Sequence, residues 1–154
     1  QTYRFAPIKA EPKTVQPGGP PIYVGGNASP ALRRAARLSD GWHANRLTPE
    51  AYREHRRRLD DFCRSADRDP AAMPTIFKIG IRMVDEPGHQ PDRSGRTLSG
   101  SPEQIAAGFE PYRQAGITSF VTPIVAADAD TFRRALERLA REVRPRLETA
   151  VPAP

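Results

Sequence analysis

The glycine pair Gly25 and Gly26, followed by Asn27, is the segment best suited to binding a ligand. A short β-branched and aromatic run precedes it and predicts a buried strand, and Ser29 followed by proline is typical of a helix N-terminus. Glycine lets the backbone approach an anion closely, and a helix N-terminus offers it free N–H groups. These residues alone favour a plain strand-to-helix turn that needs positive φ. The alternative is a phosphate-binding turn, in which Ser29 adds a contact or caps the helix.

The other residues whose side chains could bind a metal or act in catalysis are scattered along the sequence. His55 lies in a charged run that is typical of a solvated helix face, His89 lies in a polar loop, and neither is spaced to bind a metal with Cys63. We therefore expect no metal site. Three charged residues of the loop that contains His89 are candidates for covering a cofactor or substrate, with disorder as the alternative: Asp92, Arg93 and Arg96.

Composition indicates one globular domain of 154 residues, with 38% hydrophobic residues and a net charge of +6. Arginines supply most of the positive charge, and they alternate with acidic and apolar residues along helical patterns without a basic-aromatic signature. We therefore expect no nucleic-acid partner. No apolar run reaches the ~18 to 20 residues that span a bilayer, and no signal peptide is present, so we expect a cytoplasmic protein without a membrane role. The single cysteine excludes an intrachain disulfide.

Strands and helices alternate four times in the predicted pattern. We expect strands at 22–26, 41–44, 75–84 and 117–125, and helices at 31–38, 49–65, 102–115 and 128–144. Residues 85–100 predict a long polar loop. Inward-facing apolar residues are expected on the first, second and last helices, among them Leu32 and Leu38, Tyr52, Leu59, Phe62 and Cys63, and Phe132, Leu136, Leu139 and Val143.

This alternation predicts an α/β fold with parallel strands and right-handed crossovers. Four strand-helix units are half of an eight-unit TIM-type barrel, which needs ~250 residues. We expect residues 1–21 to be an extended Pro-rich lead-in, residues 22–147 to form the half barrel, and residues 148–154 to be a flexible tail.

Five segments together resemble one known family. They are PPIYVGGN at 20–27, ALRRAAR at 31–37, DGW at 40–42, GSPEQI at 100–105 and YRQAGI at 112–117. This set is similar to the luciferase-like monooxygenases, and more narrowly to actinobacterial members that use the deazaflavin coenzyme F420. The resemblance extends over nearly the whole chain and matches the C-terminal half of the family's barrel.

The resemblance implies an oxidoreductase or monooxygenase that binds F420, or alternatively FMN, at the C-terminal ends of its strands and acts on a small molecule. It places the cofactor phosphate at Gly25, Gly26, Asn27 and Ser29. The basic surplus would suit F420, which carries a phosphate and a glutamate tail. Trp42 and His43 end a strand on what would be the active face, so either is a candidate for the ring or substrate pocket. The alternatives are a core position for Trp42 and a surface loop for His43.

The chain departs from the family because about four preceding strand-helix units are absent. Those units supply many substrate contacts, so no catalytic residue is assigned. We expect either a homodimer or a separate N-terminal half to complete the barrel. The alternative function is an inactive or truncated half barrel that serves as a cofactor-binding or dimerising module.

Overall fold

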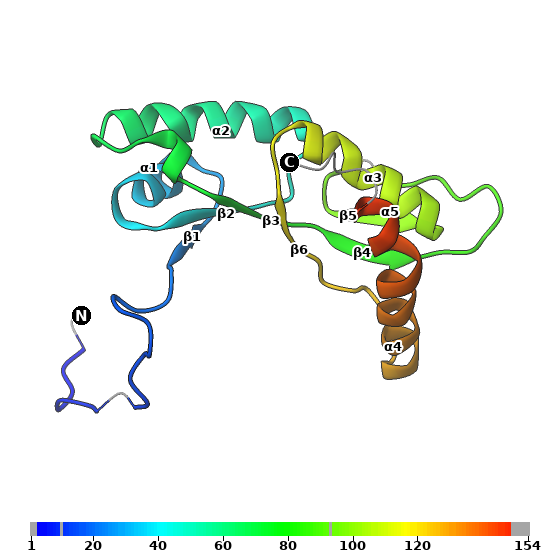
Figure 1. The fold of residues 1–154 in the computed structure, drawn as a ribbon, viewed down its shortest axis with the longest axis horizontal. Coiled ribbons are helices and arrows are strands. Elements are labelled where there is room, and N and C mark those ends of the chain that lie inside the picture. The colour runs from blue at the N-terminus through cyan, green and yellow to red at the C-terminus, as the bar shows by residue number, and fades with distance from the viewer. Residues whose placement is uncertain (1–2, 10, 93, 149–154) are drawn as a thin grey trace.

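The computed structural model describes residues 3–9, 11–92 and 94–148. Parallel strands alternate with helices along the chain (Figure 1). Before residue 23, the described residues form neither helix nor strand, and they extend away from the sheet. Arg93 and most of the expected C-terminal tail, residues 149–154, lie outside the described residues.

The main sheet has four strands in the order β1-β2-β3-β6. Their bounds are Tyr23–Gly25 for β1, Gly41–Asn45 for β2, Thr75–Lys78 for β3 and Ser119–Val121 for β6. Gly25 lies opposite His43, and Asn45 lies opposite Lys78. A helix lies between each strand and the next one in this sheet. The fold is therefore the α/β half barrel of TIM type that the sequence predicts.

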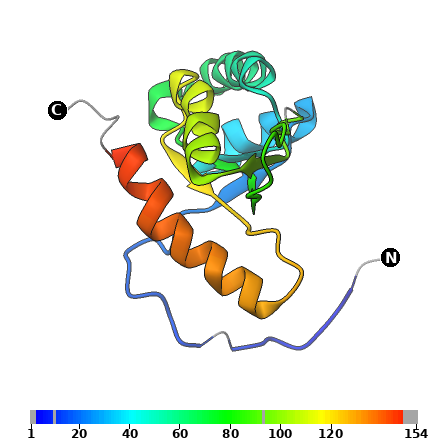
Figure 2. The same cartoon turned by 90° about the vertical axis from the view of Figure 1, so that its right-hand side faces the viewer.

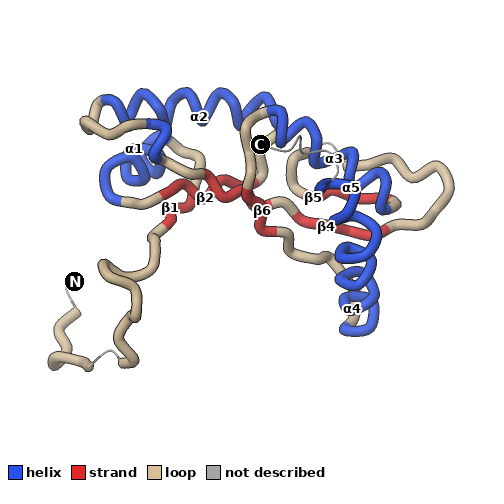
Figure 3. The backbone as a smooth tube through the Cα atoms, viewed as in Figure 1, coloured by secondary structure: helices blue, strands red, loops and turns tan. Residues whose placement is uncertain are grey.

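Figure 3 shows the helices in blue. They are α1 (Ser29–Leu38), α2 (Pro49–Arg64), α3 (Pro102–Gln114) and α4 (Ala129–Arg138). Helices α2, α3 and α4 begin within one residue of the predicted positions, whereas α1 begins two residues earlier than predicted. A short 3-10 turn, Pro70–Ala72, follows α2. The chain continues from α4 through a π turn, Leu139–Val143, into α5, Arg144–Glu148. The final helical segment thus reaches four residues beyond the predicted end at residue 144.

The predicted strand at 75–84 is in fact two strands, β3 and β4 (Gly80–Met83), which belong to different sheets. The neighbour of β4 is β5 (Thr97–Gly100), which lies inside the segment predicted to be a loop. β4 and β5 pair in parallel, and the Gly80 N–H donates to the Arg96 carbonyl at 2.9 Å. Phe77, Ile79 and Ile81 are all buried, so the alternation of buried and exposed residues continues from β3 into β4. The sequence pattern therefore gives no sign that the two strands belong to different sheets.

The core lies between the helices and one face of the strands. Trp42 of β2 stacks on Tyr52 of α2, with ring centroids 5.7 Å apart. Phe77 of β3 contacts Tyr52 edge-on and lies 5.1 Å from the ring of Tyr112 on α3. Phe120 of β6 extends this row, because its ring lies 6.4 Å from that of Phe77. Aromatic packing therefore joins α2 and α3 to three successive strands.

Three sequence-based details of the helices are wrong. Leu38 is 73% exposed and Ser39 is buried, because 100° per residue places Leu38 beside the buried stripe of α1 and Ser39 on it. On α4, Phe132 and Leu136 are 46% and 48% exposed. Figure 2 shows the reason: this helix projects away from the strands. Ala135 is the one buried residue of α4, and the C-terminal continuation, with the buried Val143, packs against α3.

Candidate functional site

The turn at Gly25 and Gly26 connects the end of β1 to the start of α1. Gly26 has φ +112°, a conformation that side chains rarely adopt. A Cβ atom added at Gly26 would lie 3.0 Å from the Cβ of Ala31, in the first turn of α1. The position therefore requires glycine for both backbone conformation and close approach to the helix.

Two hydrogen bonds from β2 fix this turn. The indole N–H of Trp42 donates to the Gly26 carbonyl at 2.8 Å, and the Asn27 amide N–H donates to the Asn45 carbonyl at 2.7 Å. The Asn27 Oδ1 atom is buried and has no hydrogen-bond partner among the described residues. An orphaned acceptor at the mouth of a glycine turn is available to a donor group from a ligand.

The N-terminus of α1 differs from the other helix starts. The predicted cap, Ser29, is inside the helix; the N-cap is Ala28, and no side chain caps this end. The Ser29 hydroxyl instead accepts a hydrogen bond from Arg58 of α2. The N-termini of α2, α3 and α4 are each capped by a side chain, from Thr48, Ser101 and Asp128. Pro30 has no N–H, and the Ala31 N–H donates to the Ala28 carbonyl at 2.9 Å. The Ser29 N–H and the Arg58 guanidinium therefore meet at one helix end, which is favourable for an anion.

Trp42 and His43 lie on opposite faces of the sheet, because successive side chains of a strand alternate. Trp42 is fully buried on the helix side, so it packs in the core and reaches the turn only through its hydrogen bond to Gly26. His43 lies on the other face, toward the barrel interior, and its Nε2 atom is buried without a hydrogen-bond partner among the described residues.

His43 borders a cavity of about 480 Å³ on this interior face. The cavity lies beside the ends of β2 and β3, and its lining consists of His43, Asn45, Arg46, Lys78, Gly80, Arg96, Thr97, Pro123 and Val125. Asn45 connects it to the glycine turn, since its carbonyl holds the Asn27 amide. The two features are neighbouring parts of one surface.

Most described residues between 84 and 96 are exposed, but the segment contacts the body of the protein at two points, Gly95 and His89. A Cβ atom at Gly95 would lie 2.4 Å from the Leu47 carbonyl oxygen, so this glycine permits close contact with the β2–α2 connection. The Asp92 carboxylate accepts hydrogen bonds from Ser94, which lower the pKa of Asp92. His89 bonds to the buried Ser99 hydroxyl at 2.9 Å. Of the three loop candidates, Arg96 reaches the cavity beside His43, Asp92 does not line it, and Arg93 is not described.

A family model described as luciferase-like monooxygenase matches residues 1–87, more than half of the sequence. The chain belongs to the luciferase-like monooxygenase family. This confirms the family that the sequence segments indicated. No curated protein matches the sequence significantly.

Solved structures resemble this luciferase-like chain at low sequence identity. The coenzyme F420-dependent tetrahydromethanopterin reductase from Methanopyrus kandleri has a TM-score of 0.65 and 15% identity, covering 82% of this chain and 51% of that one. An F420-dependent secondary alcohol dehydrogenase, in complex with an F420–acetone adduct, has a TM-score of 0.66 and 14% identity, covering 82% and 48%. A riboflavin lyase with modified FMN and riboflavin has a TM-score of 0.67 and 11% identity, covering 88% and 44%. Such identities show the fold alone, and the chain spans about half the length of these proteins.

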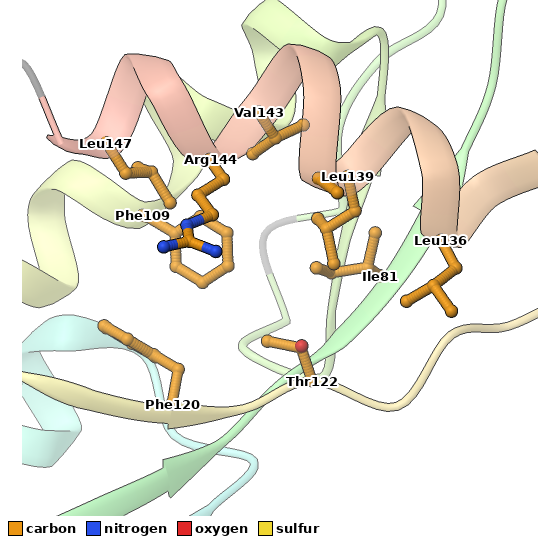
Figure 4. Close-up of a pocket in the computed structure, with 10 residues that line it drawn as sticks. Ile81, Phe109, Phe120, Thr122, Leu136, Leu139, Val143, Arg144 and Leu147 are labelled. Carbon is orange, nitrogen blue, oxygen red and sulfur yellow. The ribbon is translucent and has the colours of Figure 1, made fainter.

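An apolar cleft of about 330 Å³ separates the last helices of this luciferase-like chain from its strands. Figure 4 shows Phe120 of β6 and Ile81 of β4 on one side, and Leu139, Val143 and Leu147 on the other. Apart from Thr122 and Arg144, its lining is apolar. The cleft is therefore a packing feature of the half barrel rather than a continuation of the polar cavity.

Neither a metal centre nor a membrane span is found in this luciferase-like chain where the structure describes it. No group of three or more His, Cys, Asp or Glu residues is placed to hold a metal ion. No helix is long and apolar enough to cross a bilayer. Cys63 is fully buried, and burial raises the pKa of its thiol. His55 bonds to the Ala51 carbonyl within α2.

Proposed function

We propose that this chain is the cofactor-binding half, spanning residues 22–147, of an oxidoreductase or monooxygenase that uses F420, with FMN as the alternative. The observation that carries the proposal is the uncapped N-terminus of α1 behind the Gly25–Gly26 turn, with Arg58 beside it. The cofactor phosphate would accept hydrogen bonds from the backbone N–H and the hydroxyl of Ser29. Arg58 would supply the balancing charge.

The chain's residues fit such a phosphate. Gly26 leaves room that a side chain would fill, and the Asn27 amide N–H holds the turn against β2 through the Asn45 carbonyl. When bound, a deazaflavin or flavin supplies the hydride chemistry, or oxygen activation if it is reduced FMN. The chain's share is to hold the phosphate and to direct the ring toward the interior face, where His43 lies. F420 is preferred because its acidic groups suit the positive charge of the chain.

The activity of the whole enzyme requires a complete barrel. Val121 and Val125 on the interior side are 44% and 41% exposed, as expected of a face that another half covers. Either a second copy of this chain or a separate N-terminal half would complete it, and the substrate would be a small molecule bound in the cytoplasm. The second candidate function, a half barrel that binds cofactor or dimerises without turnover, is favoured by these same exposed residues.

The test is a fluorescence titration of the full chain with F420 and with FMN. We expect saturable binding of one of them, tighter than the binding of riboflavin, which lacks the phosphate. Gly26→Asp should abolish binding through strain and like charge. Arg58→Gln should weaken it by about ten-fold, because one charge-assisted hydrogen bond is lost. Arg57→Gln, an exposed neighbour on the same helix, is the matched control and should bind normally.

Equal binding by the Arg58→Gln and Arg57→Gln variants would contradict the phosphate site. Absence of binding to either cofactor would contradict the cofactor-binding function of this chain. Light scattering of the same samples gives the mass, which separates a homodimer from a monomer that needs a different N-terminal half.

A further inference from the structure

We propose that the cavity beside His43 is a second oxyanion site, which binds a phosphate or carboxylate group of the substrate. This assignment rests on the proposed function only in attributing the anion to the substrate. The site is separate from the α1 N-terminus, and different residues form it.

Three cationic side chains line this cavity, and no aspartate or glutamate does. Arg46 follows the last residue of β2, Lys78 is the last residue of β3, and Arg96 precedes β5. The strand register brings them together. Lys78 lies opposite Asn45, next to Arg46, and the Arg96 carbonyl accepts the Gly80 N–H at 2.9 Å.

None of these three cations forms an ion pair within the described part of the chain, whereas several other arginines pair with carboxylates. The nearest acidic influence is Asp92, whose pKa is lowered chiefly by Ser94 and to a smaller degree by Arg96. The Asp92 oxygens already accept hydrogen bonds from Ser94. Three like charges gathered without a counterion repel one another, so binding an anion there is favourable.

Arg46, Lys78 and Arg96 are exposed, and two further features of this cavity indicate a ligand site. Arg46 has φ +52°, a left-handed conformation that costs a non-glycine residue free energy and that is enriched at functional sites. The His43 Nε2 atom is buried without a partner, although buried polar atoms are normally hydrogen-bonded. A protonated Nε2 would donate to an oxyanion in the cavity.

The chemistry of the cavity defines the substrate class. Guanidinium and ammonium groups with an imidazole are suited to phosphate and carboxylate oxygens. A volume of about 480 Å³ is within the range of small-molecule pockets. The substrate we infer is a small organic molecule with at least one such group, held next to the cofactor turn through Asn45.

The experiment is a titration of the full chain with inorganic phosphate, and in parallel with succinate, followed by backbone amide chemical shifts at low ionic strength. We expect saturable shifts at the Arg46, Gly80 and Thr97 amides. The double variant Arg46→Gln with Lys78→Gln should bind about ten-fold more weakly or worse. A matched double variant of exposed arginines, Arg37→Gln with Arg141→Gln, removes the same charge elsewhere and should behave as the parent chain.

The shifts also separate this proposal from the cofactor site. Shifts confined to Gly26, Asn27 and Ser29 would overturn the second site and leave the cofactor turn standing. No shift at either place, or equal weakening in both double variants, would overturn it too. A final arm repeats the titration with F420 bound. F420 alone could shift the amide resonances of the cavity, with no further shift when phosphate is added. In that case the cofactor's acidic tail occupies the cavity, and the assignment of the site to the substrate is wrong.

Discussion

The two faces of β2 and β3 are built for different tasks. On the helix side, Trp42, Ala44 and Phe77 are fully buried under α2 and α3. On the interior side, His43 and Lys78 of the same strands border a polar cavity. Because side chains alternate along a strand, neighbouring residues are assigned to opposite tasks. Stability should therefore be sensitive to changes on the helix side, and ligand binding to changes on the interior side.

The helix ends show a similar division. Ser101 caps α3 and forms a capping box with Gln104, so its hydroxyl serves the fold. Ser29 caps nothing and contacts Arg58 instead. Two serines, each followed by proline at the start of a helix, therefore have different roles. The difference arises because α1 starts one residue earlier relative to its serine.

The largest expected effect is on the free energy of unfolding, and it contrasts Phe77 with its neighbour Lys78. Phe77→Ala should lower the free energy of unfolding by about 3–5 kcal/mol, because it empties the centre of the aromatic row. Lys78→Ala should change it by less than about 0.5 kcal/mol. Urea unfolding followed by circular dichroism measures both. Comparable losses of unfolding free energy in the two variants would mean that the two faces do not differ in their contribution to stability. If the alanine variant does not fold, Phe77→Leu provides a milder change.

A smaller effect on stability is expected in alkaline solution, where the phenol of Tyr112 ionises. Burial, with the Glu50 and Asp92 charges, raises the pKa of Tyr112 to about 12, and its hydroxyl donates to the Leu47 carbonyl. The unfolded chain ionises this phenol near ~10, so the stability that the neutral phenol contributes is complete below that pH and is lost as pH rises to about 12. Parent stability should fall by up to ~3 kcal/mol more than that of Tyr112→Phe across this interval. Parallel slopes in pH-dependent urea unfolding would contradict the assignment.

The smallest expected effect is the difference in stability between variants of Ser29 and Ser101. Ser101→Ala should cost about 1 kcal/mol, because it removes the cap of α3. Ser29→Ala should cost only a few tenths of a kcal/mol in stability, yet it should weaken cofactor binding. Thermal unfolding together with the F420 titration separates the two roles. Similar destabilisation by both variants would show that Ser29 supports its helix after all.

Local signals predicted much of the fold. Thr48 and Ser101, each followed by proline, predicted the starts of α2 and α3, because capping depends only on nearby backbone. The residues of the glycine turn were also found locally, since positive φ and close approach leave a sequence signature. Strand β5 was missed, because its short segment becomes a strand only through pairing with β4.

By itself, the sequence determined the α/β alternation, the half barrel, the family and the position of the glycine turn. Tertiary structure alone decided that Trp42 packs in the core while His43 faces the interior, that Arg58 reaches Ser29, and that Arg96 lies beside His43. The physical reason is the range of the interactions. Periodicity, capping and turn conformation are set within a few residues, whereas the partners of Arg58 and Arg96 are set by strand register and helix packing between distant segments.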